Sequence, residues 1–121
     1  MSLAVLLGVG LLGGIGAVGR HLLDELVSEH EPSVFPAGIL VVNLLGALAI
    51  GVLSGAAVHG DARRLLAAGL LGGFTTFSTW MLDSRRLAEH GHRRAFWANL
   101  LVSLAAGLVA VWLGSRIGAR L

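Results

Sequence analysis

Four long apolar stretches alternate with short polar segments along the chain, and none of the four contains Asp, Glu, Lys, Arg or His. These stretches are Ser2–Gly19, Pro32–Val58, Leu65–Leu82 and Ala95–Ser115. A membrane-spanning helix needs about 20 mainly apolar residues, so each stretch predicts one span. The spans expected are residues 2–22, 36–58, 65–84 and 95–115. The chain is therefore predicted to be an all-α membrane protein with one transmembrane domain of four helices, residues 1–121.

The polar segments between the spans are short. Arg20–Glu31, His59–Arg64 and Asp83–Arg94 are expected to be loops. The second apolar stretch is longer than a span requires, so its first residues, Pro32–Pro36, are expected to lead into a helix that starts near Pro36, because proline suits the first turn of a helix.

Composition strengthens the membrane interpretation. Hydrophobic residues make up 55% of the chain and charged residues only 13%, whereas soluble domains are about one quarter charged. The 18 glycines suit a membrane protein, in which small residues let helices approach closely. Pairs with G-x-x-x-G spacing predict such contacts at Gly10/Gly14, Gly51/Gly55 and Gly69/Gly73.

The arginines give almost no bias in membrane orientation. Four spans put both termini on one side of the membrane, together with Arg63, Arg64, Arg116 and Arg120. The other side carries Arg20, Arg85, Arg86, Arg93 and Arg94. Positive residues in short loops normally mark the inner side. The near balance is compatible with orientation by other signals, or with dual topology, in which copies insert both ways and pair antiparallel.

Enzymatic motifs are absent or misplaced. The chain has no cysteine, no H-E-x-x-H and no G-x-S-x-G. The G-x-G-x-x-G pattern at Gly8–Gly13 lies in an apolar helix rather than after a strand, so it predicts helix packing and not a dinucleotide site. His90 and His92 could bind a metal or simply form a polar loop. The arginines form no stripe of the kind that binds nucleic acid. An enzyme is not predicted.

The polar side chains expected at membrane depth are all neutral. They are Asn43 in span two, Thr75, Thr76, Ser78 and Thr79 in span three, and Asn99 and Ser103 in span four. Amide and hydroxyl donors can replace part of the water around a small anion, or can simply link helices. A proton-coupled or cation exporter usually needs a carboxylate in the membrane, and these spans offer none.

Span three contains a sequence that favours a break in the helix. Gly72 and Gly73 are followed by Phe74 and by two threonines, Thr75 and Thr76, and all of these residues are poor helix formers. A broken backbone is tolerated at membrane depth only where protein or a cavity surrounds it, and the freed carbonyls can coordinate a cation such as Na⁺. The alternative is a kinked but continuous helix.

At these residues the chain resembles the small bacterial fluoride channels of the Fluc/CrcB family. The resemblance runs from span one to span four, and the third motif is the most specific. The matching segments are Gly13-Gly14-Ile15-Gly16-Ala17-Val18-Gly19-Arg20, Gly38-Ile39-Leu40-Val41-Val42-Asn43-Leu44-Leu45-Gly46 and Gly72-Gly73-Phe74-Thr75-Thr76-Phe77-Ser78-Thr79.

The resemblance implies an architecture and a set of roles. Members of this family form antiparallel dual-topology homodimers with two pores, span the inner (plasma) membrane, and hold a central structural Na⁺ that is not transported. Backbone carbonyls of Gly72 and Thr75 would hold that Na⁺. The implied fluoride pathway comprises Asn43, Thr76, Phe77, Trp80, Asn99 and Ser103, with Phe77 offering its ring edge and Asn43 its N–H donors. Arg20 and Asp83 would lie near the vestibules.

Three positions depart from the family pattern. Trp80 stands where the family usually has a second phenylalanine, which puts pore width or rate in doubt. Ile39 replaces a common threonine, and Gly107 stands where a hydroxyl four residues beyond Ser103 would be expected. Some members work as heterodimers of two unequal chains, so the partner is either a second copy or a homologous chain.

The function predicted is a fluoride-selective channel that exports fluoride passively and so lowers its toxic concentration in the cytoplasm. Fluoride enters as HF and is trapped as the anion, which the negative interior then drives out at about 2.3 kcal/mol per 100 mV. The alternative is a dual-topology small multidrug exporter, whose usual mark is a membrane-embedded Glu that span one lacks. A third reading, a non-transporting helical subunit, would not explain the hydroxyl-rich break.

Overall fold

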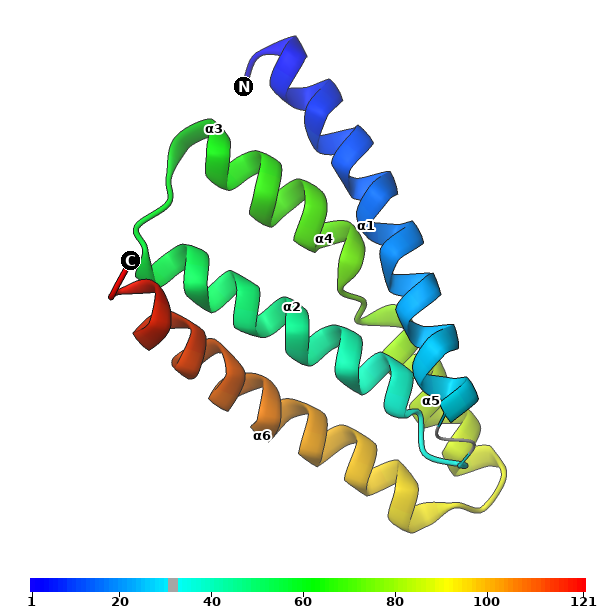
Figure 1. The fold of residues 1–121 in the computed structure, drawn as a ribbon. Helices are drawn as coiled ribbons and strands as arrows, with labels where there is room; N and C mark the ends of the chain where they lie inside the picture. Colours follow the sequence, from blue (N-terminus) through cyan, green and yellow to red (C-terminus); the bar gives the residue numbers. More distant parts are fainter. Residues whose placement is uncertain (31–32) are drawn as a thin grey trace.

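The computed structural model describes residues 1–30 and 33–121, and every regular element in that part of the chain is helical (Figure 1). Three long helices are continuous: α1 (Leu3–His30), α2 (Ala37–Gly55) and α6 (Arg93–Gly118). The segment between α2 and α6 crosses as a series of shorter helices. The three continuous helices and this segment, taken as one, are each long and apolar enough to span a membrane. The hydropathy pattern predicts the same four spans.

The third span is interrupted near its middle. It consists of α3 (Gly60–Arg63), a π-helical stretch η1 (Arg64–Leu71), α4 (Gly72–Phe74) and α5 (Ser78–Glu89). Between α4 and α5, Thr75 adopts an extended conformation, with φ −83° and ψ 159°. The green ribbon of Figure 1 leaves the helical path there. The predicted break is confirmed, and the alternative of a continuous kinked helix is wrong.

Helices α2 and α6 pack side by side through glycine (Figure 1). A Cβ added to Gly51 or Gly55 would collide with the carbonyl oxygen of Val111 or Ser115, respectively. The predicted role of this glycine pair in helix contact is confirmed. The α6 side of the interface also depends on a glycine pair, Gly114 and Gly118, which the sequence analysis did not single out.

Helix α1 packs against η1 and α4. A Cβ on Gly73 would collide with the carbonyl oxygen of Gly13, and one on Gly69 would lie 3.1 Å from the Cα of Val9. The Gly69/Gly73 pair therefore makes the predicted contact. Gly10 and Gly14 do not, since within the described residues neither has an atom within 4 Å of its Cβ position. The spacing of that pair is right for packing, but it faces away from the rest of the chain.

The helices extend beyond the apolar stretches. Arg20–His30, predicted to lie in a loop, continues α1, and α5 runs on to Glu89 before α6 begins at Arg93. Hydropathy marks where a helix leaves an apolar environment, whereas the helix itself ends only where its backbone hydrogen bonds stop. Helix α2 begins at Ala37, directly after Pro36. Pro32, where the predicted lead-in begins, lies outside the described residues.

Most large apolar side chains of the chain are exposed. Among the described hydrophobic residues, only Ile39, Val42 and Leu87 are buried, whereas Leu11 and Leu108, for example, are 70% and 66% exposed. Exposed apolar surface on this scale marks contact with lipid or with another protein chain. The chain is therefore built for a membrane, and its own contacts leave much of its surface to be covered.

Candidate functional site

The side-chain amide of Asn43 binds the backbone of the non-helical segment in the third span. Asn43 Nδ2 donates to the carbonyl oxygen of Thr76 (2.9 Å), and the Thr76 N–H donates to Asn43 Oδ1 (2.9 Å). A side-chain amide is thus paired with a backbone peptide group, as two strands of a sheet would pair. In a membrane each backbone group left by a break needs such a partner. Asn43 therefore links α2 to the non-helical segment.

Two threonine hydroxyls close the helix ends on either side of the break. Thr75 Oγ1 donates to the carbonyl oxygen of Leu71 (2.9 Å), at the end of the first half of the span. Thr76 Oγ1 accepts from the N–H of Thr79 (3.1 Å), in the first turn of α5. Side-chain oxygens at helix starts satisfy N–H groups that have no helical partner. The run of hydroxyl residues thus stabilises the interruption that it predicts.

The break also removes the helical partners of two carbonyl oxygens. In a continuous helix the Thr76 N–H would bond to Gly72 and the Thr79 N–H to Thr75. Here these two donors bond instead to Asn43 Oδ1 and to Thr76 Oγ1. The carbonyls of Gly72 and Thr75, which the family resemblance assigns to Na⁺, have therefore lost the donors that would satisfy them within a helix. Oxygen ligands of this kind suit a hard cation.

A groove runs beside the break, between α2, α5 and α6. It consists of two adjoining cavities, of about 250 and 300 Å³, that share four residues. The shared residues are Asn43, Ala47, Trp80 and Val111. Five of the predicted fluoride-pathway residues line this groove, which we call the Asn43 groove: they are Asn43, Thr76, Phe77, Trp80 and Ser103. The other walls are mainly apolar.

Two aromatic rings meet at this groove. The rings of Phe77 and Trp80 lie 5.6 Å apart, centre to centre, and are inclined by 77° in an edge-to-face arrangement. Phe77 is 69% exposed, so its ring is free to face an ion or a partner chain. The Trp80 indole is held in place, because Nε1 donates to the carbonyl oxygen of Asn99 (3.0 Å). The indole N–H of Trp80 is therefore already engaged within the chain.

Asn99, predicted to line the pathway, is buried within the chain beside Trp80. It is 1% exposed, and its Nδ2 donates to Ser84 Oγ (2.8 Å). Ser84 in turn donates to the carbonyl oxygen of Trp80 (2.8 Å), and Ser103 donates to Asn99 Oδ1 (3.5 Å). Sequence reasoning missed Ser84 because it follows an acidic residue beyond the apolar stretch. Ser84 stands four residues after Trp80, and this spacing could have indicated that its hydroxyl bonds to the Trp80 carbonyl oxygen.

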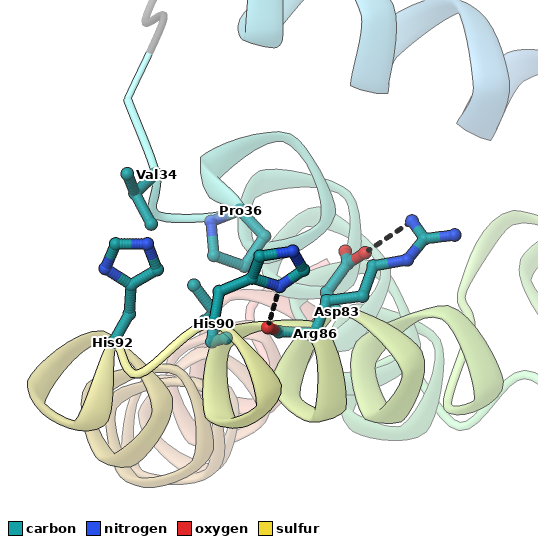
Figure 2. A pocket seen from close by; sticks show the side chains of 7 residues that line it. Val34, Pro36, Asp83, Arg86, His90 and His92 are labelled. Carbon is teal, nitrogen blue, oxygen red and sulfur yellow. Dashed lines mark hydrogen bonds and ion pairs between the residues drawn. The ribbon is translucent and has the colours of Figure 1, made fainter.

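The predicted vestibule residues lie on different elements, Arg20 on α1 and Asp83 on α5. Asp83 lines a pocket of about 240 Å³ at the α5–α6 turn, shown in Figure 2. Its Oδ1 lies 3.9 Å from Nη1 of Arg86. His90 lies in the same pocket, where its Nδ1 donates to the Arg86 carbonyl oxygen. Arg20 is half-buried on α1, and its Nε has no hydrogen-bond partner among the described residues.

The pocket residues do not assemble a metal centre. His92 lines the pocket with His90 and Asp83 (Figure 2), yet no group of three His, Cys, Asp or Glu residues suited to a metal ion occurs in residues 1–30 and 33–121.

Comparison with known proteins gives consistent matches over nearly the whole chain. Residues 7–115 match the family described as CrcB-like protein, Camphor Resistance (CrcB). A relative from Mycobacterium bovis, named fluoride-specific ion channel FluC 2, is 44% identical over 97% of this chain and 93% of its own. Another from Rubrobacter xylanophilus, named FluC 1, is 48% identical over 88% and 86%. A FluC 1 from Brucella melitensis is 38% identical over 90% and 94%.

Proposed function

This chain belongs to the CrcB family of ion channels, which are not enzymes, and we propose that it is a fluoride-selective channel of the plasma membrane through which fluoride leaves the cytoplasm. The observation that carries the proposal is the break pinned by Asn43 beside the groove of amide, hydroxyl and aromatic groups. The names of the relatives supply the identity of the anion.

Selectivity would come from neutral donors and ring edges. Asn43 has a second N–H on Nδ2, which its bond to Thr76 leaves free to donate to an anion. The edge of the Phe77 ring carries a weak positive charge. A narrow path of such groups replaces part of the hydration shell of fluoride, while chloride, a larger ion, fits poorly.

The transport would be passive. No carboxylate lies near the Asn43 groove among the residues that line it, so the groove offers no group for coupling to protons. The membrane potential alone drives an anion outward from a negative interior, at about 2.3 kcal/mol per 100 mV for one charge. Arg20, at the end of the apolar part of α1, would raise the local anion concentration at a vestibule.

Two copies would complete the channel. The exposed Phe77 ring and the unpaired apolar surface support an antiparallel homodimer, or a dimer with a homologous chain. The carbonyl oxygens of Gly72 and Thr75 from both copies would hold a structural Na⁺ that is not transported, and that ion would supply the positive charge to balance them. The donors redirected to Asn43 and Thr76 support this assignment.

Bacteria that lack their own fluoride channel provide the test of export. Cells producing this chain should hold less internal fluoride and grow at fluoride concentrations that arrest the parent strain. The proposal is wrong if the chain accumulates in the membrane while internal fluoride and growth stay those of the parent. Cells producing the Phe77→Ile variant at the same level serve as the matched control, and should remain sensitive.

A further inference from the structure

Ser84, Asn99 and Ser103 form a hydrogen-bond chain that runs from the Asn43 groove into the α5–α6 interface. Ser103, which lines the groove, donates to Asn99 Oδ1. Asn99 Nδ2 then donates to Ser84 Oγ, and Ser84 donates to the carbonyl oxygen of Trp80. All three bonds point the same way, from the groove toward α5. Ser84 and Asn99 are 2% and 1% exposed, so water does not compete with them.

This direction is unfavourable for an anion. A hydroxyl has one proton, and that of Ser103 is turned toward Asn99, so only oxygen lone pairs face the groove. The bond that holds the proton is the weakest of the chain: it measures 3.5 Å, against 2.8 Å for each of the other two. The groove end of the chain is therefore the end that is released most easily.

The chain has a second arrangement with the opposite direction. If the Asn99 amide turns by half a revolution, Ser84 donates to Asn99 Oδ1, Asn99 Nδ2 donates to Ser103 Oγ, and the Ser103 proton faces the groove. The carbonyl of Trp80 keeps its helical partner, so no buried group is left without a bond. Both serines take part because a hydroxyl both donates and accepts.

We propose that an anion in the groove beside Ser103 reverses this chain, with Ser84 as the positioning residue that keeps the Asn99 amide bonded in either orientation. An anion stabilises the reversed chain because that chain gives it the Ser103 proton while Asn99 Oδ1 still accepts from Ser84. Turning Ser103 alone would leave the buried Asn99 Oδ1 without a donor, and a cation stabilises the original chain because it meets lone pairs. The difference in contacts drives the shift. The groove thereby offers a donor to an anion without a fixed charge. This inference rests on the proposed fluoride function.

Asn43 does not share this freedom. Its amide is paired with a backbone N–H and a backbone C=O of Thr76, and neither of these can exchange its role as donor or acceptor. A half turn of Asn43 would break both bonds and replace neither. The two asparagines of the groove region are thus of opposite kinds, one fixed by the backbone and one reorientable between hydroxyls.

Asn43 and Asn99 are the only asparagines of the sequence, and it has no glutamine, so the side-chain amide signals are few and easily assigned. Protein labelled with ¹⁵N-asparagine in lipid bilayers therefore gives only two side-chain amide signals by nuclear magnetic resonance. Without fluoride, the Asn99 amide protons should show a cross-peak to the β protons of Ser84. With saturating sodium fluoride, that cross-peak should be lost and one to Ser103 should appear. Sodium chloride at the same concentration should leave the spectrum unchanged.

Ser103→Ala removes the hydroxyl that the reversed chain requires, so its Asn99 cross-peak to Ser84 should persist in fluoride. Ser103→Thr retains the hydroxyl and should switch as the wild type does. A wild-type protein that releases fluoride from liposomes of the same lipid but keeps the Ser84 cross-peak overturns this inference and leaves the channel intact. A folded protein with neither fluoride release nor a switch overturns both. Switching in Ser103→Ala would also overturn the inference.

Discussion

The paired helices α2 and α6 and the broken third span are both rich in glycine, yet they use it differently. In the α2–α6 pair, glycines such as Gly51 and Gly114 bring two continuous helices into backbone contact. In the third span, Gly73 makes such a contact with Gly13 of α1, but Gly72 and Gly73 also lie in the short helix α4, which ends at Phe74 where the helix stops. Polar side chains gather at the second region, where the interrupted backbone needs partners, and the candidate anion site is built from them.

In this membrane protein the side chains able to bind an ion gather at the interrupted helix and not between the continuous ones. Continuous helices satisfy their own backbone groups, so their interface can be made of small apolar residues alone. A break exposes N–H and C=O groups, and the side chains recruited to satisfy them, Asn43 and the threonines, are also groups able to contact an ion. The scaffold and the site therefore respond differently to substitution.

The largest effect should come from the scaffold. Gly51→Val places a branched side chain against the carbonyl oxygen of Val111, and overpacking of this kind costs about 3 kcal/mol. We expect loss of the folded protein, measured as the monodisperse yield and the thermal unfolding midpoint in detergent. Gly10→Ala is the control, because no atom of residues 1–30 or 33–121 lies within 4 Å of its Cβ position, and it should fold normally. Equal yields for both variants would contradict the packing described.

Asn43→Ala should affect stability and conduction together. It removes both bonds to Thr76 and leaves a backbone N–H and C=O unpaired, at a cost of about 1–3 kcal/mol each. Fluoride efflux from liposomes should fall steeply. Asn43→Asp would place a carboxylate at membrane depth against the Thr76 carbonyl oxygen, so it should recover neither the stability nor the flux. If Asn43→Ala matched the wild type in both measurements, Asn43 would not hold the break.

Phe77→Ile should separate conduction from stability. Because Phe77 is 69% exposed in the chain and its main contact is the edge-to-face pair with Trp80, its loss should change the unfolding free energy of a single copy by no more than about 1.5 kcal/mol. If the ring edge contributes about 1.4 kcal/mol to the binding of fluoride, its removal lowers the fraction of sites occupied by fluoride about tenfold. Efflux should then fall by the same factor. Unchanged efflux would remove Phe77 from the pathway.

Trp80→Phe should have the smallest effect. It removes one hydrogen bond to the carbonyl oxygen of Asn99, worth about 1 kcal/mol, and that carbonyl retains its helical donor. We expect a slightly lower unfolding midpoint and efflux within a few-fold of the wild type. A complete loss of efflux would show that the indole is a required part of the pathway rather than a replacement for the phenylalanine usual in the family.

The sequence predicts the spans and the break well because both are local. Hydropathy marks the spans, and the poor helix formers from Gly72 to Thr76 mark the break. The site is less predictable, because it depends on which residues meet across helices. Asn43 was expected to contact fluoride, and its bonds to Thr76, 33 positions away, could not be read from spacing. Burial of Asn99 beside Trp80 has the same origin.

Glycine spacing shows the limit of periodicity. Gly10/Gly14 and Gly51/Gly55 have the same spacing, yet only the second pair lies in a helix contact within the chain. Spacing places two glycines on one face of a helix, but only the arrangement of the other helices determines what that face meets. Gly114 and Gly118 have the same spacing as well, and they do lie in the contact between α2 and α6.

The most direct test of the account is anion efflux from liposomes that contain only this purified chain. Liposomes are loaded with fluoride or with chloride, and each anion is measured outside with a selective electrode. A fluoride-selective channel should give rapid fluoride release and little chloride release. Folded protein that releases neither anion, alone or together with a homologous second chain, or that releases both equally, would contradict it.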